Sequence, residues 1–215
     1  MTTHESTFVM IDLAGYTALT EHHGDLHAAD LAVAFADLVR GCLRGDDRLI
    51  KTIGDAVLLT AASPSEGIQL VERVLDALGT LDRAPLTRTG LHHGEAVERD
   101  GDVFGTAVNI ASRVAAHAKG GQVLATHGVA EAARQLGVPV TAQGNSMLKN
   151  LSEPYELFDL ALGPDRHAGS VDPVCRMWIQ RRKATGPQRF NGLEYWFCST
   201  DCAEQFAAEP TRYIS

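Results

Sequence analysis

FVMIDLAGYT, at residues 8–17, combines a run of apolar side chains, one carboxylate and a glycine turn. The apolar run from Ser6 to Asp12 predicts a buried strand that ends in an acid. The chain then turns toward a helical stretch from about Asp25 to Leu43. The free N–H groups and the positive dipole end of a helix attract phosphate. We therefore expect phosphate contacts from Gly15, Tyr16 and Thr17.

A second carboxylate, Asp55, follows Gly54 between two strand-like runs over Arg48–Ala61, and this pair favours a tight hairpin. In phosphoryl transfer, carboxylates hold metal ions that activate the attacking oxygen and stabilise the leaving one. Asp12 and Asp55 suit this task if their strands are neighbours. Taken singly, Asp12 could cap a helix, and Asp55 could serve only its turn.

Hydrophobic periodicity divides the first 160 residues into alternating strands and helices. A helix with Ser65 as its N-cap carries apolar residues at helical spacing from Ile68 to Leu78. A strand from Thr87 to Glu98 ends at the Asp100–Gly101 turn, and a helix follows from Thr106 to His117. Because hairpins occur among these elements, the pattern predicts an α+β sandwich rather than an all-parallel sheet. Shorter elements are expected at residues 122–126, 129–135, 138–142 and 155–160.

The composition excludes several classes of protein. A net charge of -8 disfavours binding to a phosphate backbone, so nucleic acid is not an expected partner. Hydrophobic residues make up 45% and charged residues 21%, which is a globular balance. No apolar run reaches the roughly 18 residues of a membrane span, and no signal peptide is recognisable. We expect a cytoplasmic protein without membrane insertion.

The last 55 residues differ from the rest. Residues 161–171 contain Gly-Pro and Gly-Ser pairs and predict a linker between a larger domain, residues 1–160, and a small one, residues 172–215. Cys42 stands alone, whereas the other three cysteines lie in the small domain. In a reducing compartment such a cluster indicates a metal site before a disulfide framework. The three are Cys175, Cys198 and Cys202.

Four ordered segments of the larger domain resemble the class III adenylate/guanylate cyclase catalytic domain. They are FVMIDLAGYT (8–17), KTIGDA (51–56), GDVFGTAVNIASR (101–113) and LKNL (148–151). Their order and spacing match over about residues 6–160. The resemblance implies a cyclase-type, ferredoxin-like mixed sheet with helices.

The resemblance assigns roles to individual residues. It implies Asp12 and Asp55 as ligands of two Mg²⁺ or Mn²⁺ ions in each active site. Lys51 and Asp102 match the residues that bind the adenine base, where a guanine-selective member carries a Glu and a small residue such as Cys. A Lys donor and an Asp acceptor also complement the edge of adenine chemically, so ATP is the expected substrate. Lys149 matches a lysine that contacts the terminal phosphates, although Asn150 stands where the family usually has Gly.

Asn109 and Arg113 match the pair that stabilises the transition state. They are four residues apart on the expected helix and therefore share a face. An Arg aimed at the α-phosphate stabilises charge that develops during transfer. The alternative is a polar helix face with Arg113 in a surface ion pair.

In the family, the ribose 3′-oxygen attacks the α-phosphate and pyrophosphate leaves. Asp12 and Asp55 come from one domain, and the remaining site residues come from a second. Because this chain carries the full set, the resemblance implies a head-to-tail homodimer with two active sites. A non-catalytic nucleotide- or metal-sensing dimer and a guanylate cyclase are the alternatives.

DPVCRM (172–177) and YWFCSTDC (195–202) resemble the YHS domain, a small module linked to metal handling. Three thiols suit Zn²⁺ or Cu⁺. The alternative is that they are only small buried hydrophobes. Three thiols leave a tetrahedral ion one ligand short, and Asp201, His167 or water are the expected candidates. Arg176 replaces the family's usual Gly.

In neither of two pairs of adjacent histidines are both rings expected to bind the same ion. His92 and His93 are neighbours in a strand, so their side chains point to opposite faces. His22 and His23 diverge on a helix. All four are expected to be structural or exposed to solvent.

Overall fold

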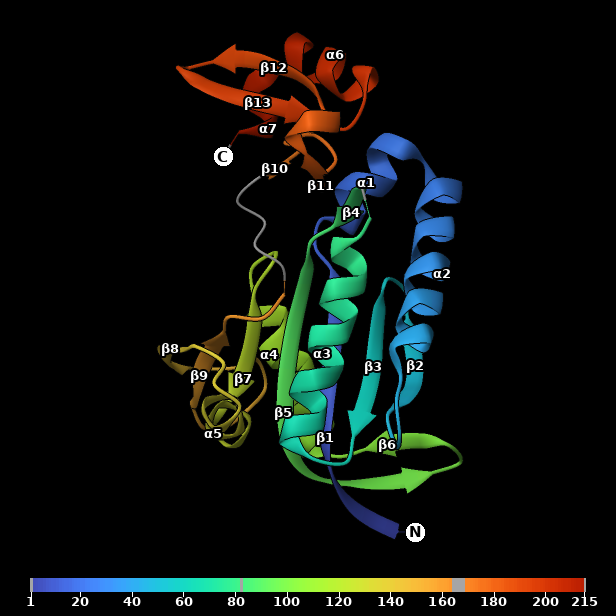
Figure 1. Cartoon of the computed structure of the whole chain (residues 1–215), viewed down its shortest axis with the longest axis vertical. Coiled ribbons are helices and arrows are strands. Elements are labelled where there is room, and N and C mark those ends of the chain that lie inside the picture. Colours follow the sequence, from blue (N-terminus) through green and yellow to red (C-terminus); the bar gives the residue numbers. More distant parts are fainter. Residues whose placement is uncertain (1, 82, 164–168, 215) are drawn as a thin grey trace.

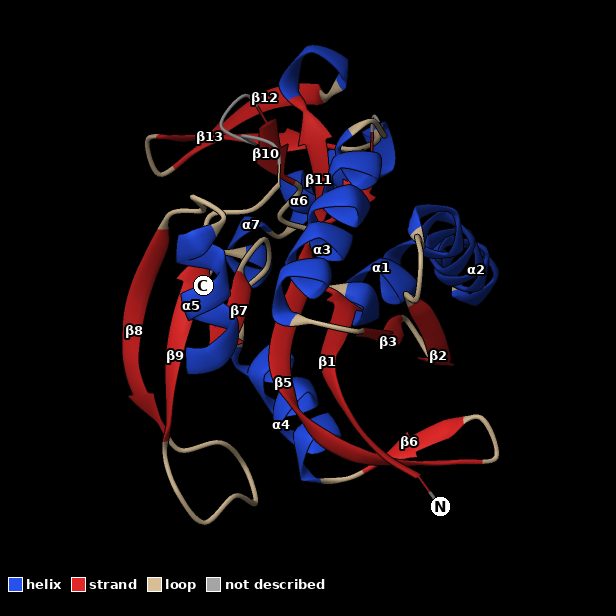
Figure 2. Cartoon of the chain, turned by 60° about the horizontal axis from the view of Figure 1, so that its bottom comes forward, coloured by secondary structure: helices blue, strands red, loops and turns tan. Residues whose placement is uncertain are grey.

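The computed structural model describes residues 2–81, 83–163 and 169–214. A mixed eight-stranded sheet forms the N-terminal body, residues 2–163, and helices cover both of its faces (Figure 1, Figure 2). This architecture confirms the expected α+β class. The strands are β1 (Thr2–Leu13), β2 (Arg48–Ile53), β3 (Ala56–Ala61), β5 (Thr87–Arg99), β6 (Asp102–Phe104), β7 (Val123–Thr126), β8 (Val140–Ser146) and β9 (Tyr155–Leu160).

The sheet runs in the order β2-β3-β1-β5-β7-β9-β8, and β6 pairs with β5. Its first four strands are antiparallel neighbours, joined in the β-α-β-β-α-β sequence of a ferredoxin-like fold. β5 and β7 are parallel, which makes the sheet mixed. The helices are α1 (Tyr16–His23), α2 (Asp25–Cys42), α3 (Pro64–Gly79), α4 (Thr106–His117) and α5 (His127–Gln135).

β1 lies in the middle of this sheet and separates two cores. Val9, Ile11 and Leu13 pack among residues of α2 and α3, whereas Phe8 and Met10 pack among residues of α4. Successive side chains of a strand point to opposite faces. Asp12 therefore continues the α4 side of the sheet.

α4 packs very closely against β5. A Cβ atom at Gly90 would overlap the backbone nitrogen of Ala115 and the backbone oxygen of Ala111. Both alanines are buried, and Val108 is half-buried beside them. Small residues on both elements thus set the position of the helix that carries Asn109 and Arg113.

The C-terminal module, residues 169–214, has a small sheet, a hairpin and short helices. Its β11 pairs on one side with β10 and on the other with β4, a strand of the N-terminal body. Figure 1 shows the module at the end of the large sheet where α1 and β4 lie. The elements are β4 (Arg83–Pro85), β10 (Gly169–Val171), β11 (Met177–Gln180), η1 (Arg181–Lys183), β12 (Thr185–Phe190), β13 (Leu193–Phe197), α6 (Thr200–Ala208) and α7 (Pro210–Tyr213).

The module and the N-terminal body also share a core. Leu19 of α1 and Ala28 of α2 are buried in one cluster with Phe197 and Phe206 of the module. Backbone pairing and apolar burial therefore both join the two parts.

Three elements differ from the sequence-based expectation. The N-cap of α3 is Ser63 rather than Ser65, because Pro64 suits the first turn and the Ser63 hydroxyl accepts a hydrogen bond from the N–H of Glu66. The expected turn at residues 15–17 instead begins α1. Within the expected linker, Gly169–Val171 form β10, because they pair with β11. In the described residues, no helix is both long and apolar enough to cross a membrane.

Gly90→Ala should destabilise the protein by about 1–3 kcal/mol, because the added methyl group would overlap the α4 backbone. Urea denaturation measures the free energy of unfolding. The matched control is Gly41→Ala in α2, where a Cβ atom meets open space and should be neutral or slightly stabilising. Equal effects of the two substitutions would contradict the close contact between α4 and β5.

Candidate active site

Two carboxylates meet at the end of β1. Asp12 is paired in register with Ala56, the first residue of β3, and Asp55 directly precedes Ala56 in the hairpin. Burial, the charge of the Asp12 carboxylate and a hydrogen bond between the two carboxyls together raise the pKa of Asp55 to about 6. The condition that their strands be neighbours is therefore met, since β1 pairs with β3. Two acids this close disfavour double ionisation unless a cation joins them.

A positively charged side chain lies beside this pair of carboxylates. Arg88 of β5 lies opposite Asp12 in the register, and its Nη2 forms an ion pair with Asp12 Oδ2. The Arg88 Nε atom is buried without a hydrogen-bond partner among the described residues. Sequence reasoning missed Arg88, because only the strand register brings it to Asp12.

Lys51 and Asp102 also meet, across β2 and β6. The Lys51 Nζ atom lies 2.7 Å from Asp102 Oδ2 and 5.7 Å from the centre of the Phe104 ring. The hydrogen bond from Lys51 lowers the pKa of Asp102. Both side chains are about one-third exposed, so a ligand can reach a paired donor and acceptor.

Asn109 and Arg113 lie one turn apart on α4, on the helix that was expected to carry them. Asn109 is exposed and Arg113 is half-buried. Among the described residues, neither side chain has a hydrogen-bond or ion-pair partner. The surface ion pair weighed for Arg113 is therefore not formed within the described part of the chain.

Lys149 is exposed in the turn after Leu148. The next residue, Asn150, has a φ of 64°, in the left-handed region that favours Gly and that Asn tolerates. At the other end of the site, Gly15 is the N-cap of α1, and Tyr16 and Thr17 are its first two residues.

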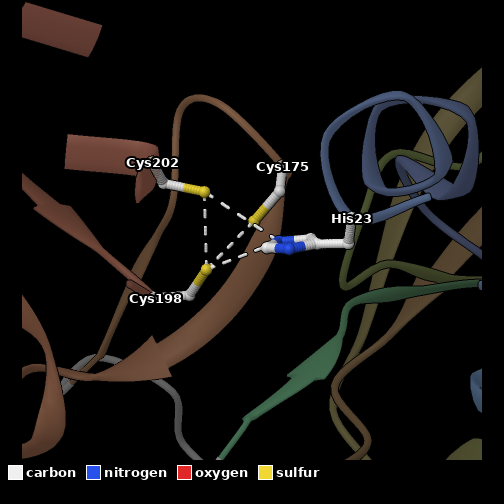
Figure 3. A group of neighbouring side chains, drawn as sticks. All are labelled: His23, Cys175, Cys198 and Cys202. Atoms are coloured by element: carbon white, nitrogen blue, oxygen red, sulfur yellow. Dashed lines mark hydrogen bonds between the residues drawn. The ribbon is translucent and has the colours of Figure 1, made fainter. Parts of the chain in front are cut away.

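A second group of ligand atoms lies at the joint between the two parts of the chain. Cys175, Cys198 and Cys202 come together as expected, and the Nε2 atom of His23 joins them (Figure 3). His23 is expected from the sequence to be structural or solvent-facing, and α1 turns its half-buried ring toward the three thiols of the C-terminal module. His22 also faces the module, where its Nδ1 lies 2.6 Å from Gln205 Oε1.

The structure describes one of the two side chains expected as candidates for the fourth ligand. Asp201 is exposed at the start of α6 and is not in the group. His167 lies outside the described residues.

His92 and His93 face opposite sides as expected, since His92 contacts Thr126 and His93 contacts Thr7. Burial lowers the pKa of His92 to about 4.

Comparison with known proteins identifies the family of each domain. The model of the adenylate and guanylate cyclase catalytic domain matches residues 1–160, and that of the YHS domain matches residues 170–215. The chain belongs to the class III nucleotidyl cyclase family. Its cyclase domain is thus followed by a YHS domain, which is the C-terminal module.

Relatives match through the cyclase domain. A pH-sensitive adenylate cyclase of Mycobacterium tuberculosis is 38% identical over 126 residues, which are 59% of this chain and 32% of that protein. An adenylate cyclase of Glutamicibacter nicotianae is 33% identical over 150 residues, 68% of this chain and 37% of that protein. The matched part thus spans about a third of each relative. A Trypanosoma brucei adenylate cyclase structure, solved in a monomeric state, has a TM-score of 0.64 at 26% identity, covering 76% of this chain and 90% of that one.

Asp55→Asn should stabilise the metal-free protein at pH 8. The folded-state pKa of about 6 lies above the ordinary value, so ionised Asp55 destabilises the fold above pH 6 and this cost disappears as the pH falls toward 4. The gain should be about 1 kcal/mol, discounted because the residue is only half-buried. Urea denaturation in EDTA at pH 8 and pH 4 measures it. Asp46→Asn, at an exposed acid, is the control; the account fails if Asp55→Asn is no more stable than wild type at pH 8.

Proposed function

We propose that this chain is an adenylate cyclase that converts ATP to 3′,5′-cyclic AMP and pyrophosphate at sites formed between two copies. The proposal rests on one observation: Asp12 and Asp55 lie together at the end of β1, the strand that leads into Gly15 and α1. A paired carboxylate site next to a helix N-terminus fits a polyphosphate with bound divalent metal ions.

The donor set fits Mg²⁺ or Mn²⁺, two in each active site. Carboxylate oxygens are the ligands that these ions prefer. Burial and the neighbouring Asp12 carboxylate raise the pKa of Asp55, and a divalent cation would allow both acids to ionise. When bound, the metal ions lower the pKa of the ribose 3′-hydroxyl and stabilise the pyrophosphate leaving group. Asp12 and Asp55 would hold them, and Arg88 would supply positive charge beside the phosphates.

The base specificity rests on Lys51 and Asp102. Without substrate, each satisfies the other through their ion pair. Adenine would replace that contact, because its N1 accepts a hydrogen bond from Lys51 and its N6 donates one to Asp102. Guanine presents the opposite polarity and would leave both charged groups unpaired, which disfavours a guanylate cyclase. The complete set of site residues disfavours a non-catalytic sensor.

Asn109, Arg113 and Lys149 complete the site. Arg113 would stabilise the charge that develops on the α-phosphate, and Asn109, on the same face of α4, would orient the ribose. Lys149 would contact the terminal phosphates. Because their side chains are unpartnered in the described chain, a ligand can engage Asn109 and Arg113 without breaking an existing bond.

Exposed apolar side chains beside these residues support the homodimer. Ile53, Phe104 and Met147 are 51%, 53% and 64% exposed, and each lies within two residues of Lys51, Asp55, Asp102 or Lys149. Large apolar side chains that are exposed beside site residues are candidates for an interface. A head-to-tail dimer would cover these side chains and bring Asp12 and Asp55 of one copy to the remaining site residues of the other.

Complementation tests both the metal ligands and the shared site. Asp55→Ala and Arg113→Ala homodimers should each be inactive, because every site lacks one essential group. After subunit exchange, an equal mixture should regain about one-quarter of the wild-type rate, since half the dimers hold one intact site. Cyclic AMP formation from ATP and Mn²⁺ measures it.

Mixing Asp55→Ala with Asp12→Ala is the matched control. Both substitutions remove ligands of the same metal pair from the same copy, so no intact site forms and no activity should return. If proven heterodimers of Asp55→Ala and Arg113→Ala stay inactive, the shared site is refuted. If Asp55→Ala is active alone, the metal assignment is refuted.

A further inference from the structure

Four metal-ligating side chains from two domains converge at the joint. His23 is the last residue of α1 in the cyclase domain, Cys175 lies before β11, Cys198 follows β13 and Cys202 is in the first turn of α6. Their ligand atoms all lie within 4.8 Å of one another (Figure 3). The three cysteines are buried free thiols. The group is distinct from Asp12 and Asp55.

The distances between these ligand atoms match those between the ligands of a tetrahedral metal ion. The Sγ atom of Cys198 lies 3.5 Å from that of Cys175, 3.6 Å from that of Cys202 and 3.6 Å from His23 Nε2, and Cys202 Sγ lies 3.9 Å from the same nitrogen. Zinc bonds of about 2.3 Å to sulfur and 2.0 Å to nitrogen place tetrahedral ligands about 3.6–3.8 Å apart. Three thiolates and one imidazole form a closed structural zinc set.

Buried hydrogen bonds hold the two cysteine loops in place. Asp172 is fully buried, and its carboxylate accepts hydrogen bonds from the N–H groups of Val174 and Cys198 at 2.8 and 2.7 Å. The hydroxyl of Ser199 accepts one from the N–H of Cys202. Such outer-shell contacts orient the ligands before an ion arrives.

We propose that His23, Cys175, Cys198 and Cys202 bind one Zn²⁺ ion that ties the YHS domain to α1 of the cyclase domain and thereby braces the loop that enters the active site. His23 is the essential part of this inference. The three thiols alone would make a site internal to the YHS domain, whereas the imidazole makes it a joint between domains.

A direct contact connects this joint to the active-site loop. Arg176, next to the ligand Cys175, has a φ of 63°, and its side chain packs on Gly15 so closely that a Cβ atom at Gly15 would overlap it. Gly15 is the N-cap of α1 and precedes Tyr16 and Thr17. An ion that fixes both Cys175 and the end of α1 therefore restrains both ends of this helix.

The first test measures zinc affinity of the full chain without nucleotide. Wild-type protein should bind one Zn²⁺, and X-ray absorption of the loaded protein should give three sulfur and one nitrogen ligand. His23→Ala should weaken binding by more than the roughly 100-fold that loss of an outer-shell partner costs. His27→Ala is the matched control, because His27 lies one turn further along the chain, near His23 but outside the ligand group.

The second test measures hydrogen exchange of residues 14–23 with saturating zinc. Zinc should slow exchange about tenfold or more in wild type and in His27→Ala, in both this segment and the cysteine loops. In His23→Ala, zinc held by the three thiols should slow only the cysteine loops. The effect of zinc on hydrogen exchange in residues 14–23 thus distinguishes a metal site shared by the two domains from one that lies within the YHS domain alone.

Several results would overturn the proposal. The first is wild-type protein with reduced thiols that binds no zinc. The second is an X-ray absorption spectrum that shows no nitrogen ligand to the zinc. The third is a His23→Ala variant that behaves as wild type in both tests. The X-ray absorption spectrum is recorded on wild-type protein, so the proposal stays testable even if His23→Ala fails to fold. Because neither test uses nucleotide or activity, failure here is distinguishable from failure of the proposed cyclase function.

Discussion

The antiparallel pairing of β1 with β3 on one edge and β5 on the other positions the two carboxylates of the cyclase domain and the arginine beside them. Its register sets Asp12 beside Ala56, and hence beside Asp55, and places Arg88 opposite Asp12. A slip of one residue would turn Asp12 from the α4 side to the α2 and α3 side. The same strand leads directly into Gly15 and α1, so the two carboxylates and the loop expected to bind phosphate share one support.

The second constraint is the joint between the two domains. The YHS domain adds β11 to β4, buries Leu19 and Ala28 in its own core and packs Arg176 on Gly15. An independent tethered domain would need none of these contacts. Apolar burial of this kind contributes on the order of 25 cal/mol for each Å² removed from water. The three cysteines of the ligand group belong to the same buried cluster. The joint therefore places the cysteine cluster against His23 and packs Arg176 against the start of α1.

Local patterns predicted most of the cyclase domain, and tertiary pairing explains what they missed. The helix over Thr106–His117 and the hairpin around Gly54 and Asp55 were predictable because periodicity and turn chemistry act within a few residues. The pairs Asp12–Asp55 and Lys51–Asp102 followed from the family resemblance, and the structure brings each together. By contrast, Arg88 and His23 gain their partners only through strand register and domain docking, which no local pattern encodes. The three-residue strand β4 was missed for the same reason.

The most direct test of the account is product analysis after the purified full chain is incubated with Mn²⁺ and either ATP or GTP. The account predicts cyclic AMP and pyrophosphate in equal amounts from ATP, because Lys51 and Asp102 match adenine and the two carboxylates hold the metal ions. It predicts that GTP is a poor substrate. Failure to form a cyclic nucleotide from either substrate, by protein shown to be folded and dimeric, would contradict it, and so would preferential formation of cyclic GMP.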